Sequence, residues 1–67
     1  MITVKVNNTT HQIPCNHSLE ILLKRLAISV DGIAVAINEN IISKTDWINT
    51  TLLDGDNILI IKATQGG

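Results

Sequence analysis

The strongest constraint on the fold is one stretch of helical periodicity in a chain that otherwise alternates as strands do. Ser18 is a preferred N-cap residue type, and Glu20 follows it in the first helical turn. Lys24 and Arg25 come near the end, where positive charge complements the helix dipole. Four leucines at i, i+3, i+4 and i+7 make one apolar face: Leu19, Leu22, Leu23 and Leu26. These independent signals predict a helix that begins after Ser18.

The other apolar segments have the alternation of strands. Asn7 and Asn8 follow the first of them, and asparagine tolerates the positive φ of a tight hairpin turn. Pro14 ends the returning segment, because proline cannot donate to a strand ladder. The apolar residues at 58–61 are almost continuous, which predicts a last strand that is central in the sheet or buried on both faces. The strand segments are, in order, residues 1–6, 9–13, 32–40, 41–43 and 57–64.

Between the third and the last strand, two short segments have distinct roles. Trp47 is the chain's one aromatic residue, so we expect it to anchor the core from a single irregular or helical turn at 44–50. A place in a docking surface is the less favoured alternative for Trp47. Asp54 and Asp56 flank Gly55, and their default role is to accept hydrogen bonds from nearby backbone amides in a turn. An alternative role is an acidic face that a basic partner recognises. That face would consist of Glu39, Asp46, Asp54 and Asp56.

Charge and composition exclude several classes of partner. The net charge is −1, with five Lys and Arg, so the chain has no basic footprint for nucleic acid. No uninterrupted apolar stretch approaches the roughly 20 residues that a membrane-spanning helix needs. Cys15 has no internal disulfide partner, and Met1 leads directly into a strand segment without a signal sequence. We expect a soluble, cytoplasmic protein that binds neither nucleic acid nor membrane.

The sequence also lacks the usual motifs of catalysis and metal binding. Its four glycines are too dispersed for a phosphate-binding loop, and no nucleophile motif is present, so we expect a protein that is not an enzyme. His11, Cys15 and His17 are three possible zinc ligands where a structural site takes four, and Pro14 interrupts their strand. We expect two surface histidines, a small semi-buried thiol and no bound metal or cofactor. A persulfide on Cys15 is a less favoured alternative.

The end of the sequence carries the strongest functional signal. Residues 64–67 follow the last strand and can project up to about 13 Å when extended, so we expect a flexible tail there. Gly66 and Gly67 have no Cβ, so they can enter a narrow channel and leave the Gly67 carboxyl open to attack on an activated phosphate. Joined to AMP, that carboxyl becomes an acyl donor. Gly66 and Gly67 are therefore the candidate site residues.

Taken over all 67 residues, the chain resembles the ThiS family among the ubiquitin-like β-grasp carriers. The resemblance is carried by "VAINENIISKTDW" at 35–47, "LLDGDNILII" at 52–61 and the final "QGG". Ser43 and Lys44 stand where the family often has Pro and Arg. Lys44 keeps the positive charge but lacks the planar guanidinium group of Arg. The resemblance implies an α+β fold with one domain over 1–67. It would be a mixed sheet of four to five strands packed on one helix.

The same resemblance implies a sulfur carrier of thiamin biosynthesis. An E1-like adenylyltransferase similar to ThiF would use ATP and Mg²⁺ to adenylate the Gly67 carboxylate. A sulfur donor protein would convert the adenylate to a thiocarboxylate, and a thiazole synthase similar to ThiG would take the sulfur. The alternatives are a carrier like the small subunit of molybdopterin synthase, a ubiquitin-like protein modifier, and a noncovalent interaction module. Fold alone does not separate these alternatives.

Overall fold

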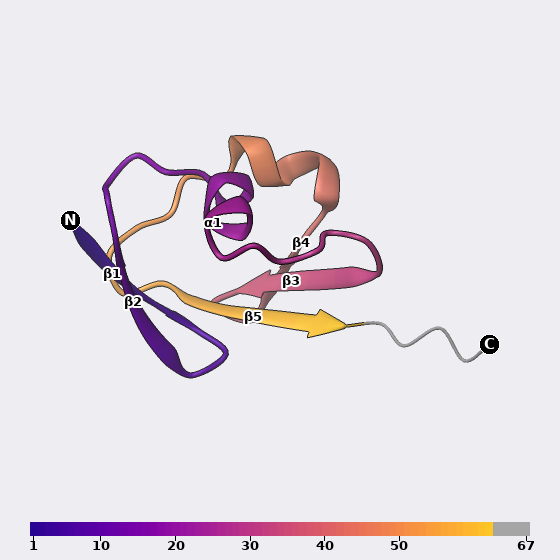
Figure 1. The fold of residues 1–67 in the computed structure, drawn as a ribbon, viewed down its shortest axis with the longest axis horizontal. Helices are drawn as coiled ribbons and strands as arrows, with labels where there is room; N and C mark the ends of the chain where they lie inside the picture. Colours follow the sequence, from indigo (N-terminus) through magenta and orange to yellow (C-terminus); the bar gives the residue numbers. More distant parts are fainter. Residues whose placement is uncertain (63–67) are drawn as a thin grey trace.

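The chain forms a five-stranded mixed sheet with its α-helix packed against one face (Figure 1). The structure is a computed structural model, and it describes residues 1–62. The elements are β1 (Ile2–Val6), β2 (Thr9–Ile13), α1 (Leu19–Arg25), β3 (Ile33–Ile37), β4 (Asn40–Ile42), the 3₁₀ helix η1 (Lys44–Asn49) and β5 (Asn57–Lys62). This confirms the predicted α+β class and the order of the elements along the chain.

The last strand lies in the middle of the sheet. The strand order is β2-β1-β5-β3-β4, in which β5 runs parallel to β1 and antiparallel to β3. The hairpins β1–β2 and β3–β4 supply the two outer pairs. The central position predicted for the last strand is thus confirmed, and the first and last strands of the described chain are parallel neighbours.

Asparagine residues form the turn of the first hairpin. Asn7 has a φ of 48° and Asn8 a φ of 69°, the left-handed conformation that a two-residue hairpin turn requires. The register pairs Val6 with Thr9 and Ile2 with Ile13, so the two strands match over their full length. Asparagine tolerates this backbone better than other residues with a side chain, which explains the prediction from the sequence.

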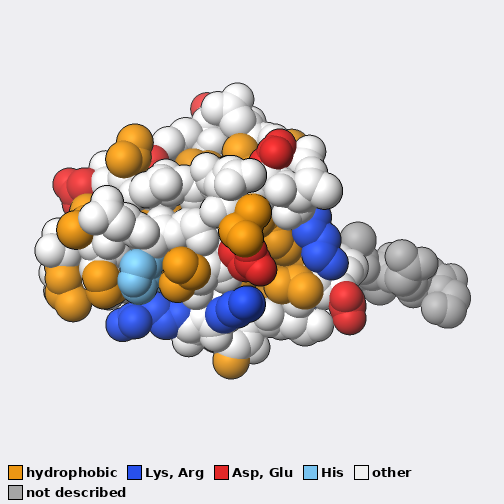
Figure 2. All heavy atoms as spheres, turned by 90° about the horizontal axis from the view of Figure 1, so that it is seen from above, with side chains coloured by type: hydrophobic (Ala, Val, Ile, Leu, Met, Phe, Trp, Pro, Cys, Tyr) orange, Lys and Arg blue, Asp and Glu red, His pale blue; other side chains and the backbone are white. Residues whose placement is uncertain are grey.

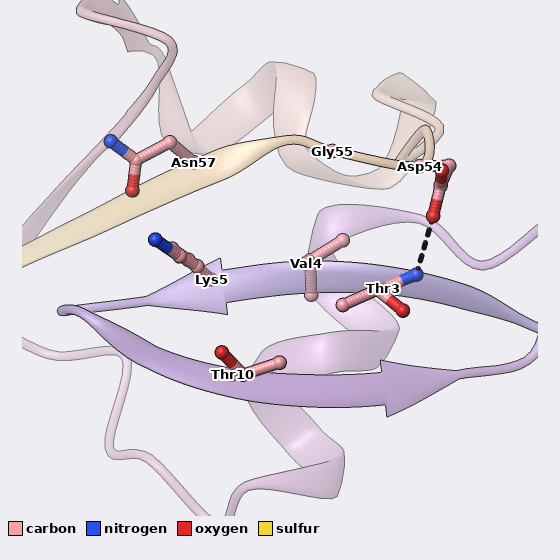
Figure 3. A pocket seen from close by; sticks show the side chains of 7 residues that line it. All are labelled: Thr3, Val4, Lys5, Thr10, Asp54, Gly55 and Asn57. Carbon is pink, nitrogen blue, oxygen red and sulfur yellow. Dashed lines mark hydrogen bonds between the residues drawn. The ribbon is translucent and has the colours of Figure 1, made fainter.

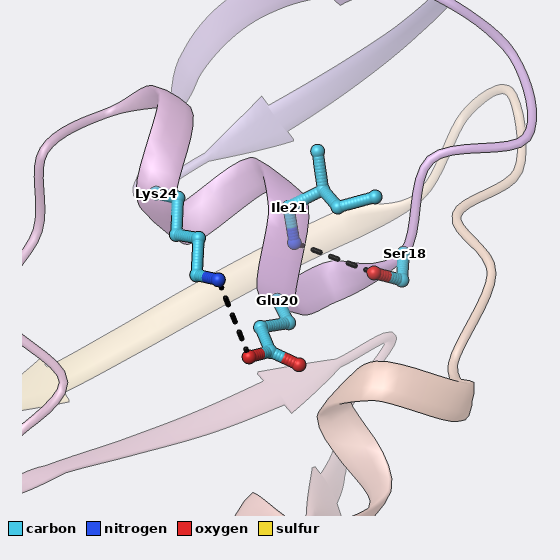
Figure 4. A network of polar contacts seen from close by, with 4 residues as sticks. All are labelled: Ser18, Glu20, Ile21 and Lys24. Carbon is cyan, nitrogen blue, oxygen red and sulfur yellow. Dashed lines mark hydrogen bonds and ion pairs between the residues drawn. The ribbon is translucent and has the colours of Figure 1, made fainter.

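The helix α1 is capped at both ends, by a side chain at its start and by backbone hydrogen bonds at its end. The Ser18 hydroxyl accepts a hydrogen bond from the Ile21 N–H at 3.3 Å, and Lys24 pairs with Glu20 at 3.7 Å (Figure 4). At the other end, the Ala27 N–H donates to the Lys24 carbonyl and the Ile28 N–H to the Leu23 carbonyl. This pair of bonds is a Schellman motif, with Ala27 in the left-handed conformation at a φ of 56°.

The core lies between one face of the sheet and the layer formed by α1 and η1. The three leucines of α1 are fully buried, and Trp47 is 3% exposed. The Trp47 indole N–H donates to the Ile42 carbonyl at 2.9 Å, so its polar atom is satisfied inside the core. Trp47 is therefore the core anchor that the sequence predicted. The core cluster contains Val4, Val6, Ile13, Leu19, Leu22, Leu23, Val35, Ile37, Trp47, Leu52 and Ile58.

The expectation that the last strand is buried on both faces is wrong. In β5, Ile58 is fully buried, but Leu59 is 49% exposed and Ile61 is 45% exposed. Alternate side chains of a strand point to opposite faces, and α1 covers the face that Ile58 and Ile60 share. Within residues 1–62, no second layer covers the other face. Across the same residues, no helix has the length and apolar character needed to cross a bilayer.

Candidate functional site

The candidate site residues Gly66 and Gly67, and the tail predicted at 64–67, lie outside the described residues. The described part of the chain that leads to them is β5, whose last residue, Lys62, is also the last described residue. In Figure 1, β5 runs beside β3, and its arrowhead marks the C-terminal end of the strand. What holds β5 in place determines where residues 63–67 start.

The two edges of β5 are held to different extents. Along β3, the antiparallel register continues from Ile37↔Ile58 to Ile33↔Lys62. Along β1, the parallel register has only two pairs, and its last is Val6↔Ile58. The ladder with β1 therefore ends four residues before Lys62.

The Asn7 side chain extends this short edge. The Asn7 N–H donates to the Ile58 carbonyl at 2.9 Å, directly after the last strand pair. The Asn7 Oδ1 accepts from the Ile60 N–H at 2.8 Å, and the Asn7 Nδ2 donates to the Ile60 carbonyl at 3.3 Å. One side-chain amide thus satisfies both backbone groups of Ile60, as a further strand residue would.

The "DGD" connection closes the other end of β5. Asp56 is 8% exposed, and its carboxylate accepts from the Leu53 N–H at 2.8 Å and from the Asn38 Nδ2 at 3.0 Å. The Asp54 Oδ1 accepts from the Thr3 N–H at 2.8 Å, as Figure 3 shows. The predicted turn chemistry is confirmed. The alternative acidic face is wrong for Asp56, because its carboxylate is buried in this turn.

A shallow hollow opens beside this connection. Figure 3 shows Thr3 and Lys5 of β1, Thr10 of β2 and Asn57 of β5 around it, with Gly55 at its edge. Gly55 has a φ of 87°, and its N–H donates to the Thr3 carbonyl at 2.8 Å, so glycine suits this turn. The hollow combines hydroxyl, amide and ammonium groups with the Asp54 carboxylate. That carboxylate accepts from the Thr3 backbone N–H and not from a hydroxyl, so the described lining residues form no bonded pair of nucleophile and base.

The three possible zinc ligands have different surroundings. Cys15 is exposed, which corrects the expectation of a semi-buried thiol, because the chain after Pro14 turns away from the sheet before α1. His11 and His17 are half-buried and not fully on the surface. The His17 Nδ1 is buried, and no residue within 1–62 gives it a hydrogen bond. Over the same residues, no three His, Cys, Asp or Glu side chains converge as metal ligands.

The uncovered face of the sheet carries an apolar patch, here called the outer patch. Its exposed members are Ile41, Leu59 and Ile61. Ala36 lies directly opposite both Leu59 and Ile41, and Ala34 lies opposite Ile61, so all five side chains share one face. Exposed apolar side chains gathered on one face are typical of a protein interaction site. The face seen in Figure 2 carries acidic, basic and hydrophobic side chains interspersed with one another.

Reasoning from the sequence missed the side-chain contacts of Asn7 and the burial of Asp56. Both residues stood in turns whose type was predicted, but their partners lie far away in the sequence. Asn7 bonds to Ile60, 53 positions away, and Asp56 bonds to Asn38, 18 positions away. No local pattern could have indicated these pairs.

Comparisons with known proteins agree with this architecture. The model of the ThiS family matches residues 3–67. "Sulfur carrier protein ThiS" of Escherichia coli (strain K12) is 31% identical over 61 residues, which are 91% of this chain and 92% of that protein. The crystal structure of a thiamine biosynthesis protein (ThiS) from Geobacter metallireducens superposes with a TM-score of 0.87 at 20% identity. The superposition covers 98% of this chain and 100% of the Geobacter metallireducens chain. This similarity supports the β-grasp fold. The chain belongs to the ThiS family.

Proposed function

We propose that this chain is a sulfur carrier of thiamin biosynthesis and that the Gly67 carboxyl carries the sulfur. The observation that supports this most is the family match over residues 3–67, which includes Gly66 and Gly67. The Escherichia coli relative bears the name of a sulfur carrier protein. The chain would act as a protein-sized cosubstrate, and the catalytic groups would belong to its partner enzymes.

The proposed reaction activates the carboxyl before sulfur arrives. A carboxylate is a poor acyl donor, so an E1-like adenylyltransferase would let it attack the α-phosphate of ATP, with Mg²⁺ neutralising the phosphates and pyrophosphate leaving. Hydrosulfide supplied by a donor protein would then attack the carbonyl and displace AMP, which leaves a thiocarboxylate. A thiazole synthase would take the sulfur from that group. We propose a cytoplasmic location for this reaction.

The described residues offer the partner enzymes a rigid body and a docking surface. β5 lies between β1 and β3, so the residues that follow Lys62 start from a fixed strand. The outer patch lies on this same strand, at Leu59 and Ile61. We propose that the adenylyltransferase docks on the outer patch while residues 64–67 enter its nucleotide site. The ThiS family match favours this function over a molybdopterin-synthase-type carrier or a protein modifier.

The proposed function is tested by substitutions at the two glycines. Gly66→Val should leave the melting temperature nearly unchanged, because terminal residues generally contribute little to stability and the buried core cluster of the described residues extends from Val4 to Ile58. Adenylation should fall by orders of magnitude, because a β-branched side chain widens and stiffens the segment that must enter a narrow channel. Deletion of Gly67 should act similarly, by moving the carboxyl roughly 3.5 Å away from the α-phosphate.

The measurement is ATP–pyrophosphate exchange with the cognate adenylyltransferase, followed by intact mass spectrometry after a sulfur source is added. Gly66→Ala serves as the graded variant, since its smaller side chain should give an intermediate loss. Exchange at the wild-type rate in both Gly66→Val and the deletion variant would refute the proposal that Gly67 carries the sulfur.

A further inference from the structure

We propose that Asn7 is a positioning residue for the carrier reaction. Its side chain holds the last part of β5, the strand from which the chain continues toward Gly67. This inference rests on the proposed function, because a fixed strand end matters to a reaction only if the end of the chain must reach a partner's reaction centre. It concerns a residue in the β1–β2 turn, far in the sequence from Gly67.

The geometry of Asn7 is that of a substitute strand residue. Regular pairing between β1 and β5 ends at Val6↔Ile58, and the next backbone bond is the Asn7 N–H to the Ile58 carbonyl at 2.9 Å. The side-chain amide then takes both the N–H and the carbonyl of Ile60, at 2.8 and 3.3 Å. The β1 edge of β5 is thereby held for two residues more than the strand pairing alone provides.

Few other side chains could make both bonds from this position. The amide of asparagine is chemically a peptide group, with one carbonyl acceptor and an NH₂ donor, whereas aspartate has acceptors only. The backbone at Asn7 is also left-handed, with a φ of 48°, which asparagine and glycine tolerate best. Asn8 has the same backbone class, with a φ of 69°, and makes no side-chain hydrogen bond to any residue within 1–62. The turn geometry alone therefore does not explain why Asn7 has this contact.

The position of Ile60 makes the contact relevant to the reaction. Ile60 lies two residues before Lys62, and Asn7 and β3 hold β5 from opposite edges at this point. Only five residues, 63–67, join Lys62 to the Gly67 carboxyl. The proposal is that the end of β5 must be held in place while that carboxyl occupies the nucleotide site. A misplacement of about 1 Å can reduce the rate of a positioned reaction on the order of 100-fold. Loss of the Asn7 amide should therefore lower the rate of adenylation and not the affinity for the partner.

The experiment compares Asn7→Gly with Asn8→Gly. Both variants keep a residue that tolerates positive φ, but only the first removes the amide bonded to Ile60. The first readout is ATP–pyrophosphate exchange, which gives kcat and KM for the carrier. The second is hydrogen exchange of the Ile60 amide, measured by NMR. Both are measured below the melting temperature of each variant. For Asn7→Gly we expect kcat to fall about tenfold or more with KM unchanged, and Ile60 to exchange faster. Asn8→Gly should match the wild type in all three.

Asn7→Asp provides a second variant that keeps the turn conformation. It retains an acceptor for the Ile60 N–H but sets a second acceptor against the Ile60 carbonyl, so its kcat should lie between those of the wild type and Asn7→Gly. A purely structural role would lower the melting temperature and leave kcat unchanged; equal kcat in Asn7→Gly and Asn8→Gly would therefore overturn the inference. Absence of exchange with the wild-type carrier would instead overturn the proposed function, and this inference with it.

Discussion

At the scale of single residues, the carboxylate of Asp56 is a buried charged group that needs hydrogen-bond partners inside the protein. It is 8% exposed and accepts hydrogen bonds from the Leu53 N–H and the Asn38 Nδ2. Asn38 in turn accepts from the Asn57 N–H at 3.0 Å, so the three residues link the β3–β4 turn to the start of β5. Burial of a carboxylate costs free energy, and here charge-assisted hydrogen bonds offset the loss of its bound water.

We expect Asp56→Ala to destabilise the fold by roughly 2–3 kcal/mol, because the Leu53 N–H and the Asn38 amide both lose their acceptor. The matched control is Asp54→Ala. Asp54 accepts a single backbone bond, from Thr3, and is exposed, so its removal should cost less than about 1 kcal/mol. Urea denaturation followed by circular dichroism measures both. Equal losses would show that the bonds to Asp56 contribute no more than one exposed turn contact.

This residue also shows how far the sequence could predict the turn. The "DGD" pattern indicated a tight connection with side-chain caps, because Asp and Gly have those local preferences. It did not distinguish Asp54 from Asp56. Which of the two is buried depends on where Asn38 lies, and that is a property of the assembled sheet. Local chemistry is thus predictable here, whereas burial of one particular carboxylate is not.

At the scale of elements, the helix α1 was predicted almost completely. The leucine spacing, the Ser18 cap and the charges at the two ends all depend on residues within one element, and all are confirmed. The apolar face includes Leu26, which still packs on the core although α1 itself ends at Arg25. The sequence contains no glycine at the C-terminal cap, so it did not indicate that Ala27 adopts a φ of 56°.

Ala27 is therefore a site where the helix can be stabilised. A left-handed conformation costs an L-residue with a Cβ about 1–2 kcal/mol, and glycine avoids that cost at the price of a more flexible unfolded chain. We expect Ala27→Gly to raise the free energy of unfolding by about 0.5–1 kcal/mol, seen as a melting temperature a few degrees higher.

The control for this substitution is Ala34→Gly in β3, where glycine gains no conformational advantage. That variant should be less stable than the wild type, because glycine weakens a strand interior. If Ala27→Gly lowers the melting temperature as Ala34→Gly does, the Schellman geometry at Ala27 does not govern the stability of α1.

At the scale of the whole molecule, the sheet has one covered face and one open face. The sequence predicted the central position of β5 but not its open face. An apolar run at 58–61 indicates that both faces of the strand are apolar, and it cannot state what covers each of them. In the structure α1 and η1 cover one face, and the outer patch is left exposed on the other within residues 1–62. The face of β5 that was wrongly expected to be buried is thus the face that carries the outer patch, the proposed docking surface.

The outer patch gives the last prediction, which concerns the proposed docking of an adenylyltransferase. Leu59→Lys should change stability little, because Leu59 is already 49% exposed. It should raise the KM for the carrier at least tenfold, because a tenfold change needs only about 1.4 kcal/mol and an apolar contact would be replaced by a desolvated charge. Ile48→Lys is the control. It introduces the same side chain on η1, where Ile48 is 63% exposed, outside the outer patch.

These two variants have equal net charge, so long-range attraction or repulsion of the partner affects both alike, and any difference between them reports the location of the interface. Pyrophosphate exchange at varied carrier concentration gives the KM, and a pull-down with the adenylyltransferase gives binding without turnover. Selective loss with Leu59→Lys supports docking on the outer patch, next to the strand that leads to Gly67. If Ile48→Lys raises the KM as much as Leu59→Lys does, the partner does not distinguish the two faces. The proposal that the exposed side of β5 forms the interface would then be wrong.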